Sequence, residues 1–345
     1  MKRSWKRTAI ALALAAMSSV AWAQTVKVTP LGSHAGELCS RDRATVFEDP
    51  SGLRILYDAG QSVQGADDPR LGTIHVVLVS HAHGDHIGDM KLKAQGAGTC
   101  DNPDLVSAAP ASTSGEIAAA KNAALVMVGP MANFLAKKVE TINRKATPAC
   151  PQASDVMTAP FASACVAGVN LGGARIVKLA DGKTVEITVV PASHDSTVPR
   201  ALLSEEERKH MEADNVSVQL GQPTGYVIRF SNGLVAYLTG DTGMFAEMKT
   251  TMADFHKVNL MELNLGYSAL NAAAAAHIAN DLVKPSTVLL SHVNEAATTG
   301  GKAKGGTHTA DVVSLVKGRA VHLALSGKTM EFDGSGKCVA GCAAP

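Results

Sequence analysis

The chain has 345 residues, 46% of them apolar, with 32 lysine and arginine residues against 31 aspartate and glutamate residues. Four of the basic residues and none of the acidic ones lie within residues 1–23, so the rest of the chain carries about −3 in net charge. This composition predicts a globular protein of one large domain or two modest ones. It argues against a strongly basic surface for nucleic acid, and we expect no nucleic-acid partner.

The first 23 residues have the form of an export signal. Two basic pairs, at 2–3 and 6–7, precede an apolar run, and Ala21-Trp22-Ala23 matches the small-x-small pattern at which signal peptidase cuts. The run is shorter than the roughly 20 apolar residues of a membrane span, and no later stretch is long enough. We expect cleavage near Ala23, a periplasmic or secreted protein, and no membrane anchor.

Six cysteines lie outside this signal, an even number in a chain that we expect to fold in an oxidising compartment. Cys150 is near Cys165 and Cys338 is near Cys342, which leaves Cys39 to pair with Cys100, although six cysteines allow fifteen pairings. None of them forms a CxxC pair, so disulfides are favoured over a cysteine metal site.

The first half of the chain alternates strand and helix patterns. Residues 26–59 predict a strand, a loop and a hairpin, and the apolar run at 75–80 predicts a strand buried on both faces. A helix with Ser114 as its N-cap is expected over 114–123, a strand over 125–128 and a helix over 131–144. The Pro-, Ala- and Cys-rich residues 145–166 are expected to be loop. Such alternation predicts an α/β layered fold.

The second half continues this mixture without repeating its sequence. Helices are expected over 244–255 and 269–282. Strands are expected over 175–180, 184–191, 224–230, 233–240, 259–264 and 286–291.

A compact group of metal-ligand side chains follows the strand expected at 75–80: His81, His83, Asp85 and His86. His81 and His83 are two apart and project alike from an extended strand end, whereas Asp85 and His86 point elsewhere as the chain turns at Gly84. Imidazoles and a carboxylate together suit zinc, manganese or iron. The pattern predicts a site for two metal ions.

The segment HAHGDHIGD at 81–89 resembles the HxHxDH signature of the metallo-β-lactamase superfamily. The resemblance implies an αββα sandwich, two mixed β-sheets with helices outside, in which a third histidine, an acid and a last histidine each follow a strand. This chain offers His194 after VVPAS, Asp241 after AYLTG and His292 after VLLS. Asp58, in LYDAG, resembles the family's aspartate beneath the metal site.

The same resemblance implies a role for each ligand. One ion would take His81, His83 and His194, the other would take Asp85, His86 and His292, and Asp241 would bridge both. The ions would be zinc, with manganese or iron as alternatives, and a hydroxide between them would attack an ester, lactone or phosphodiester-type small molecule. Asp85 and Asp241 would orient that hydroxide and hold both ions.

Further segments resemble one branch of the superfamily, the ascorbate-6-phosphate lactonase-like hydrolases: 169–173, 191–196, 225–230 and 240–248. Residues about 100–165 and 200–222 look like insertions in the one hydrolase domain expected over 24–345. Gly266-Tyr267-Ser268 replaces a segment in which that branch tends to carry a histidine. His34 either faces the metal pocket or lies in a solvated loop, and the charged run in 200–222 is either a solvated helix face or a lid.

Three other functions share parts of this pattern. A β-lactamase of this fold is disfavoured, because the recognised ones lack a bridging carboxylate at the position of Asp241. RNA-processing endonucleases share the cluster, but an exported, mildly acidic protein offers no RNA-binding surface. Non-hydrolytic iron-binding redox members use the same ligands, commonly with a flavin domain or reactive cysteines, and residues 310–345 predict no such domain.

Overall fold

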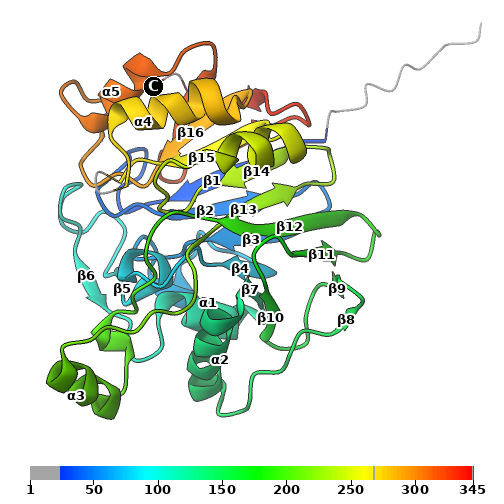
Figure 1. Ribbon diagram of the computed structural model, residues 1–345, viewed down its shortest axis with the longest axis vertical. Coiled ribbons are helices and arrows are strands. Elements are labelled where there is room, and N and C mark those ends of the chain that lie inside the picture. The colour runs from blue at the N-terminus through cyan, green and yellow to red at the C-terminus, as the bar shows by residue number, and fades with distance from the viewer. Residues whose placement is uncertain (1–23, 267–268, 344) are drawn as a thin grey trace, which may run out of the picture.

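The computed structural model of the chain describes residues 24–266, 269–343 and 345, so the expected export signal lies outside the described residues. Two mixed β-sheets pack face to face, and helices lie on the outer side of each sheet (Figure 1). This arrangement confirms the αββα class expected from the sequence. Among the described residues, no helix combines the length and the apolarity that crossing a membrane requires.

The first sheet contains the early strands of the chain. In spatial order its strands are β10 (Cys165–Val169), β7 (Ala124–Val128), β4 (Val76–Leu78), β3 (Arg54–Tyr57), β2 (Ala44–Glu48), β1 (Val26–Leu31), β20 (Met330–Phe332) and β21 (Cys338–Ala340). The β2–β3 hairpin is antiparallel, as the turn at 50–52 predicts, whereas β3, β4, β7 and β10 run parallel. Helices α1 (Thr113–Lys121) and α2 (Gly129–Asn143) cover its outer face (Figure 1).

The second sheet contains the later strands. In spatial order they are β19 (Ala320–Leu323), β16 (Thr287–Ser291), β15 (Leu260–Asn264), β14 (Val235–Leu238), β13 (Thr224–Arg229), β12 (Thr184–Pro191), β11 (Ala174–Lys178), β9 (Val156–Thr158) and β8 (Gln152–Ala153). Helix α4 (Ala272–His277), its continuation η5 (Ile278–Val283) and α5 (His308–Leu315) lie outside this sheet (Figure 1).

Smaller elements connect these layers. They are η1 (Gly65–Asp67), η2 (Gly84–Gly88), β5 (Met90–Leu92), β6 (Leu105–Ser107), η3 (Arg200–Leu202), α3 (Glu205–Asp214), η4 (Lys249–Phe255), β17 (Thr298–Thr299) and β18 (Lys302–Ala303). Helix α3 carries the charged run of residues 200–222 and projects from the periphery of the molecule (Figure 1).

Aromatic side chains join the two sheets in the core. Tyr57 of β3 meets Tyr226 of β13 edge to face, with ring centroids 6.2 Å apart, and Phe47 of β2 stacks on Phe230 at 6.0 Å. The Tyr226 hydroxyl donates a hydrogen bond to Val79 O at 2.7 Å, just before the histidine cluster. Buried aromatic pairs of this kind contribute about 0.5–1.5 kcal/mol each beyond the area that they bury. The core therefore fixes the cluster against the second sheet.

Several sequence-based expectations need correction. The N-cap of α1 is Ser112, whose side chain accepts from Gly115 N, rather than Ser114. Residues 145–166 are not all loop, since β9 pairs with β11 and β10 begins at Cys165 beside β7. The helix expected over 244–255 is helical only toward its end, in η4. Strand β9 forms because it pairs with β11, and such long-range pairing leaves no pattern in the local sequence.

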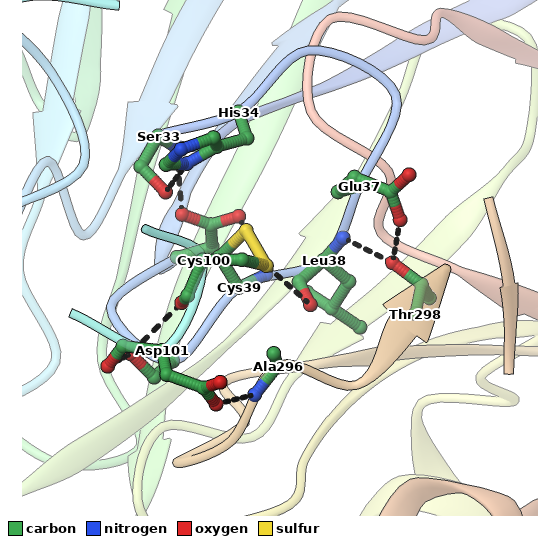
Figure 2. Close-up of a disulfide and its surroundings, with 12 residues drawn as sticks. Ser33, His34, Glu37, Leu38, Cys39, Cys100, Asp101, Ala296 and Thr298 are labelled. Carbon is green, nitrogen blue, oxygen red and sulfur yellow. Dashed lines mark hydrogen bonds between the residues drawn. A yellow bond between two sulfur atoms is a disulfide. The ribbon is translucent and has the colours of Figure 1, made fainter. Parts of the chain in front are cut away.

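All three expected disulfides are present: Cys39–Cys100, Cys150–Cys165 and Cys338–Cys342. Figure 2 shows the first, which joins the loop after β1 to the loop between β5 and β6. Nearby, Asp101 Oδ1 accepts a hydrogen bond from Ala296 N at 2.9 Å, and Leu38 N donates to Thr298 Oγ1 at 2.8 Å. Three loops that are distant in sequence are thus held together.

Candidate metal centre

The early cluster lies in the loop that leaves β4. His81 lies three residues after the end of β4, His83 has an extended backbone, and the chain then turns through η2, which carries Asp85 and His86. A Cβ atom on Gly84 would lie 2.4 Å from Asp89 Oδ1, so a larger residue here would require the Asp89 side chain to move.

The later residues come from one edge of the second sheet. Both β12 and β14 run antiparallel to β13, and β15 and β16 run parallel to β14, so these four strands end at the same edge. His194 follows β12, Asp241 follows β14 and His292 follows β16. Strand direction alone brings the three side chains, separated by up to 98 residues (292 − 194), to the loop after β4.

Six of the seven residues form two adjoining groups, and Asp241 lies between them. The first group is His81, His83 and His194, and the second group is Asp85, His86 and His292; within each group the ligand atoms lie within 4.8 Å of one another. In the first group the ring centroids are 4.5–5.0 Å apart. In the second, the Nε2 atoms of His86 and His292 are 3.0 Å apart.

Asp241 lies between the two groups. Its Oδ1 is 2.8 Å from His292 Nε2 and 3.4 Å from His86 Nε2, whereas its Oδ2 is 3.9 Å from His194 Nε2. One carboxylate oxygen thus faces each group. The side chains of His83 and Asp85 are 28% and 24% exposed, while those of His86 and Asp241 are 2% and 8% exposed. The site is open to solvent on the side of His83 and Asp85.

Polar neighbours hold the ring nitrogens that point away from the centre. His86 Nδ1 lies 2.7 Å from Asp58 Oδ2, and His81 Nδ1 lies 3.0 Å from Ser80 Oγ. Asp58 also accepts from the backbone and the hydroxyl of Ser80, both at 2.7 Å. Asp58 therefore lies beneath the cluster, where the resemblance places it, and supports two of its rings.

The electrostatics of the site suit positive ions. Burial, with the neighbouring His86, holds the pKa of His81 well below its ordinary value. Burial alone would lower the pKa of His86, but the carboxylates of Asp241, Asp58 and Asp85 raise it well above that value. Despite burial, the pKa of Asp85 is held well below the ordinary range by His86 and Arg43, and that of Asp241 by His292 and His86. Ionised carboxylates and a neutral imidazole are the forms that bind metal.

The donor set fits a divalent metal. His81 Nε2 is buried at the centre and has no hydrogen-bond partner among the described residues. A buried nitrogen left in this way costs free energy unless a ligand takes it. Imidazole nitrogens with carboxylate oxygens are the donors that zinc, manganese and iron take.

Sequence reasoning did not single out three residues that the structure brings to the centre. Asp195 Oδ1 lies 2.7 Å from His83 Nε2, Arg43 contacts Asp85, and the buried Glu262 of β15 lines the same small cavity as Asp241 and His292. Asp195 directly follows His194, which was a usable signal, but nothing in the sequence around Arg43 or Glu262 indicates their roles. His34 hydrogen-bonds Ser33 at 3.1 Å, beside the Cys39–Cys100 disulfide (Figure 2).

The fold and the site define a class. The chain has the metallo-β-lactamase fold and, like the curated proteins that it resembles, is a metal-dependent hydrolase. Among curated proteins, the chain is similar to a UPF0173 metal-dependent hydrolase of Pyrococcus furiosus. The two are 25% identical over 247 residues, which cover 70% of this chain and 77% of that protein. No family model matches the chain.

Two solved structures share the fold. Igni18, a novel metallo hydrolase of Ignicoccus hospitalis, is 22% identical with a TM-score of 0.53, and the match covers 90% of this chain and 99% of that one. Zinc-bound PqqB of Methylobacterium extorquens is 11% identical with a TM-score of 0.50, over 88% and 99% of the two chains. At these identities the likeness concerns the fold.

Proposed function

We propose that this hydrolase works with two divalent metal ions, one at each group of ligands, with Asp241 bridging them. The observation that carries the proposal is the placement of Asp241, whose two oxygens face different groups. Each group has three candidate ligands of its own, and a third set of ligand atoms within 4.8 Å of one another, His81, His86 and Asp241, joins the two groups. We favour zinc, with manganese or iron as alternatives.

The ring nitrogens divide accordingly. His86 Nδ1 is engaged by Asp58 and His81 Nδ1 by Ser80, which leaves their Nε2 atoms for an ion. His83 Nε2 is engaged by Asp195, which leaves Nδ1. A hydrogen bond to the second nitrogen fixes the tautomer and the ring orientation of a metal ligand.

When bound, two such ions lower the pKa of a water between them and polarise a carbonyl or phosphoryl oxygen. Asp85 and Asp241 would orient that water as proton acceptors, because their low pKa values keep both carboxylates ionised at neutral pH. No serine, cysteine or lysine nucleophile is called for. The substrate is a small molecule, and we propose an ester, a lactone or a phosphodiester.

We also propose that the enzyme is exported, as its first 23 residues indicate. The disulfides support this, since such bonds persist in oxidising compartments. The kinship with ascorbate-6-phosphate lactonase-like enzymes stays part of the proposal and rests on the sequence segments that resemble them. Cleavage near Ala23 removes both tryptophans, so the purified mature protein should show only tyrosine fluorescence.

The test combines metal content with activity. Purified wild-type protein should contain two ions per chain by elemental analysis and hydrolyse at least one member of a panel of lactones, thioesters, phosphodiesters and β-lactams. His83→Ala should lower kcat/KM by about 100-fold or more, because even residues that only support a ligand cost 10–100-fold. His277→Ala removes an exposed histidine of α4 and is the matched control.

The outcomes separate the alternatives. Full turnover by His83→Ala with normal metal content would refute the ligand assignment. Turnover of β-lactams alone would favour the β-lactamase alternative. An iron-loaded protein that hydrolyses no member of the panel would favour the redox alternative.

A further inference from the structure

We infer that Arg43 is a positioning residue that sets the metal affinity of the second group, Asp85, His86 and His292, and leaves that of the first group unchanged. The inference rests on the proposed function, because it presumes an ion at each group. Arg43 precedes β2 on the loop that carries Cys39, and its side chain is 2% exposed.

The guanidinium of Arg43 grips a ligand carboxylate. Its Nε and Nη2 atoms lie 3.1 and 3.0 Å from the same oxygen of Asp85, Oδ2. That oxygen is also 3.5 Å from His292 Nε2 and 3.8 Å from His86 Nε2. Arg43 therefore holds the carboxylate oxygen that faces the second group, and the grip is charge-assisted.

The same guanidinium holds the chain just after His292. Its Nη1 donates to Val293 O at 2.9 Å, and its Nη2 donates to Asn294 Oδ1 at 2.8 Å. This backbone needs support, because His292 has a φ of 50°, in the left-handed region that a side chain disfavours. One side chain thus fixes two ligands, Asp85 and His292, that come from different sheets.

The loop that carries Arg43 is itself anchored. Nη1 also donates to Ser40 O and Asp42 O, at 3.3 and 3.1 Å, so the guanidinium is tied to its own loop. Figure 2 shows that loop fastened to its neighbours by the Cys39–Cys100 disulfide and by the bond from Leu38 N to Thr298 Oγ1. Because its loop is held in place, the guanidinium of Arg43 is held in place beside Asp85.

Charge and position act in opposite directions here. A cation beside Asp85 opposes the binding of a second cation, so its loss would strengthen binding, whereas loss of the grip would free the ligands and weaken binding. We expect the loss of positioning to have the larger effect on metal affinity, because one planar guanidinium contacts Asp85, Val293 and Asn294 at once. A lysine keeps the charge but cannot reproduce that fork.

The experiment measures zinc affinity by competition with a chromophoric chelator, on full-length mature protein. Arg43→Lys should weaken the second-group ion by about 10–100-fold, the range for residues that support a ligand. Arg54→Lys is the matched control, since Arg54 is paired with Glu48 and bonded to Thr73 O at the far end of β3. It should leave both affinities unchanged.

Combining Arg43→Lys with a second substitution shows which of the two metal-binding groups Arg43 affects. With His83→Ala, which disables the first group, Arg43→Lys should weaken the remaining ion; with His292→Ala, which disables the second, it should have no effect. Equal weakening in both backgrounds, or an unchanged second-group affinity, would overturn the inference. Should Arg43→Lys fail to fold, Asn294→Ala decides: this exposed residue should show a smaller loss at the second group, and no loss overturns the inference.

The two proposals fail in different ways. Wild-type protein that binds fewer than two ions would refute the proposed function itself. Wild-type protein with two ions, together with an unaffected Arg43→Lys variant, would refute only the role of Arg43.

Discussion

Glu262 should make the stability of this protein fall as pH rises. The residue lies in the middle of β15, is 2% exposed, and faces β2 of the other sheet, where Thr45 Oγ1 donates to its Oε1 at 2.8 Å. Burial raises the pKa of Glu262 from 4.5 to about 8, and hydrogen bonds from Thr45 and Ser291 offset only part of that rise. The carboxyl is therefore protonated in the folded protein at neutral pH.

The sign and the size of the effect follow by linkage. Because the pKa of Glu262 is higher in the folded state, the folded protein keeps a proton that the unfolded chain releases. The stability contributed by this proton is fully present below pH 4.5 and is lost as pH rises through about 8. The interval of about 3.5 pH units, at ~1.36 kcal/mol each, sets an upper value of about 5 kcal/mol.

The variant Glu262→Gln isolates this contribution. Glutamine keeps the oxygen that accepts from Thr45 and stays neutral at every pH, so the variant should match wild type near pH 4.5 and exceed it by up to about 5 kcal/mol at pH 8.5. Urea unfolding followed by circular dichroism, with chelator present, measures the difference. Glu206→Gln, on the exposed surface of α3, is the matched control. Parallel stability curves for wild type and Glu262→Gln between pH 5 and 8 would refute the reasoning.

Two further predictions concern the disulfides and Asp195. Cys39 and Cys100 are 61 residues apart, so replacing both by alanine should lower the free energy of unfolding by about 4 kcal/mol, according to the entropy of closing the loop. Cys338 and Cys342 are four residues apart, so the same replacement there should cost only about 2 kcal/mol. Equal losses in urea unfolding would contradict this prediction. Asp195→Ala should weaken zinc binding at the first group by about 10-fold. This is the low end of the range for a residue that supports a ligand, because the Asp195 side chain is half exposed. An unchanged zinc affinity would show that His83 needs no such partner.

Strand ends were the most predictable part of the site. His81, His194, Asp241 and His292 each follow an apolar β-rich run, and the structure brings all four together. Buried strands leave a strong local pattern, because each residue must be apolar on whichever face it presents. The resemblance predicts that Asp241 bridges two ions, and in the structure its two carboxylate oxygens face different ligand groups.

Supporting residues were much harder to predict. Arg43 precedes Asp85 by 42 residues and His292 by about 250, so its contacts depend on how two loops pack. Glu262 occupies a strand that reads as apolar, and no local pattern distinguishes a buried acid from an exposed one. The strands within 145–166 were missed for a similar reason: β9 has three residues, and its pairing with β11 exists only in the folded chain. Short strands are selected by their partners.

Each of the two ligand groups draws side chains from both halves of the sandwich. His194 joins His81 and His83 across the sheets, and His292 joins Asp85 and His86 in the same way. A metal ion held by either group is therefore also a crosslink between the sheets, and it disappears when the chain unfolds. At a free metal concentration 1,000 times its Kd, each ion would add about 4 kcal/mol to the stability of the fold. Scarcity of metal would then lower the activity and the stability of the enzyme together, so that its lifetime would depend on the metal concentration around it.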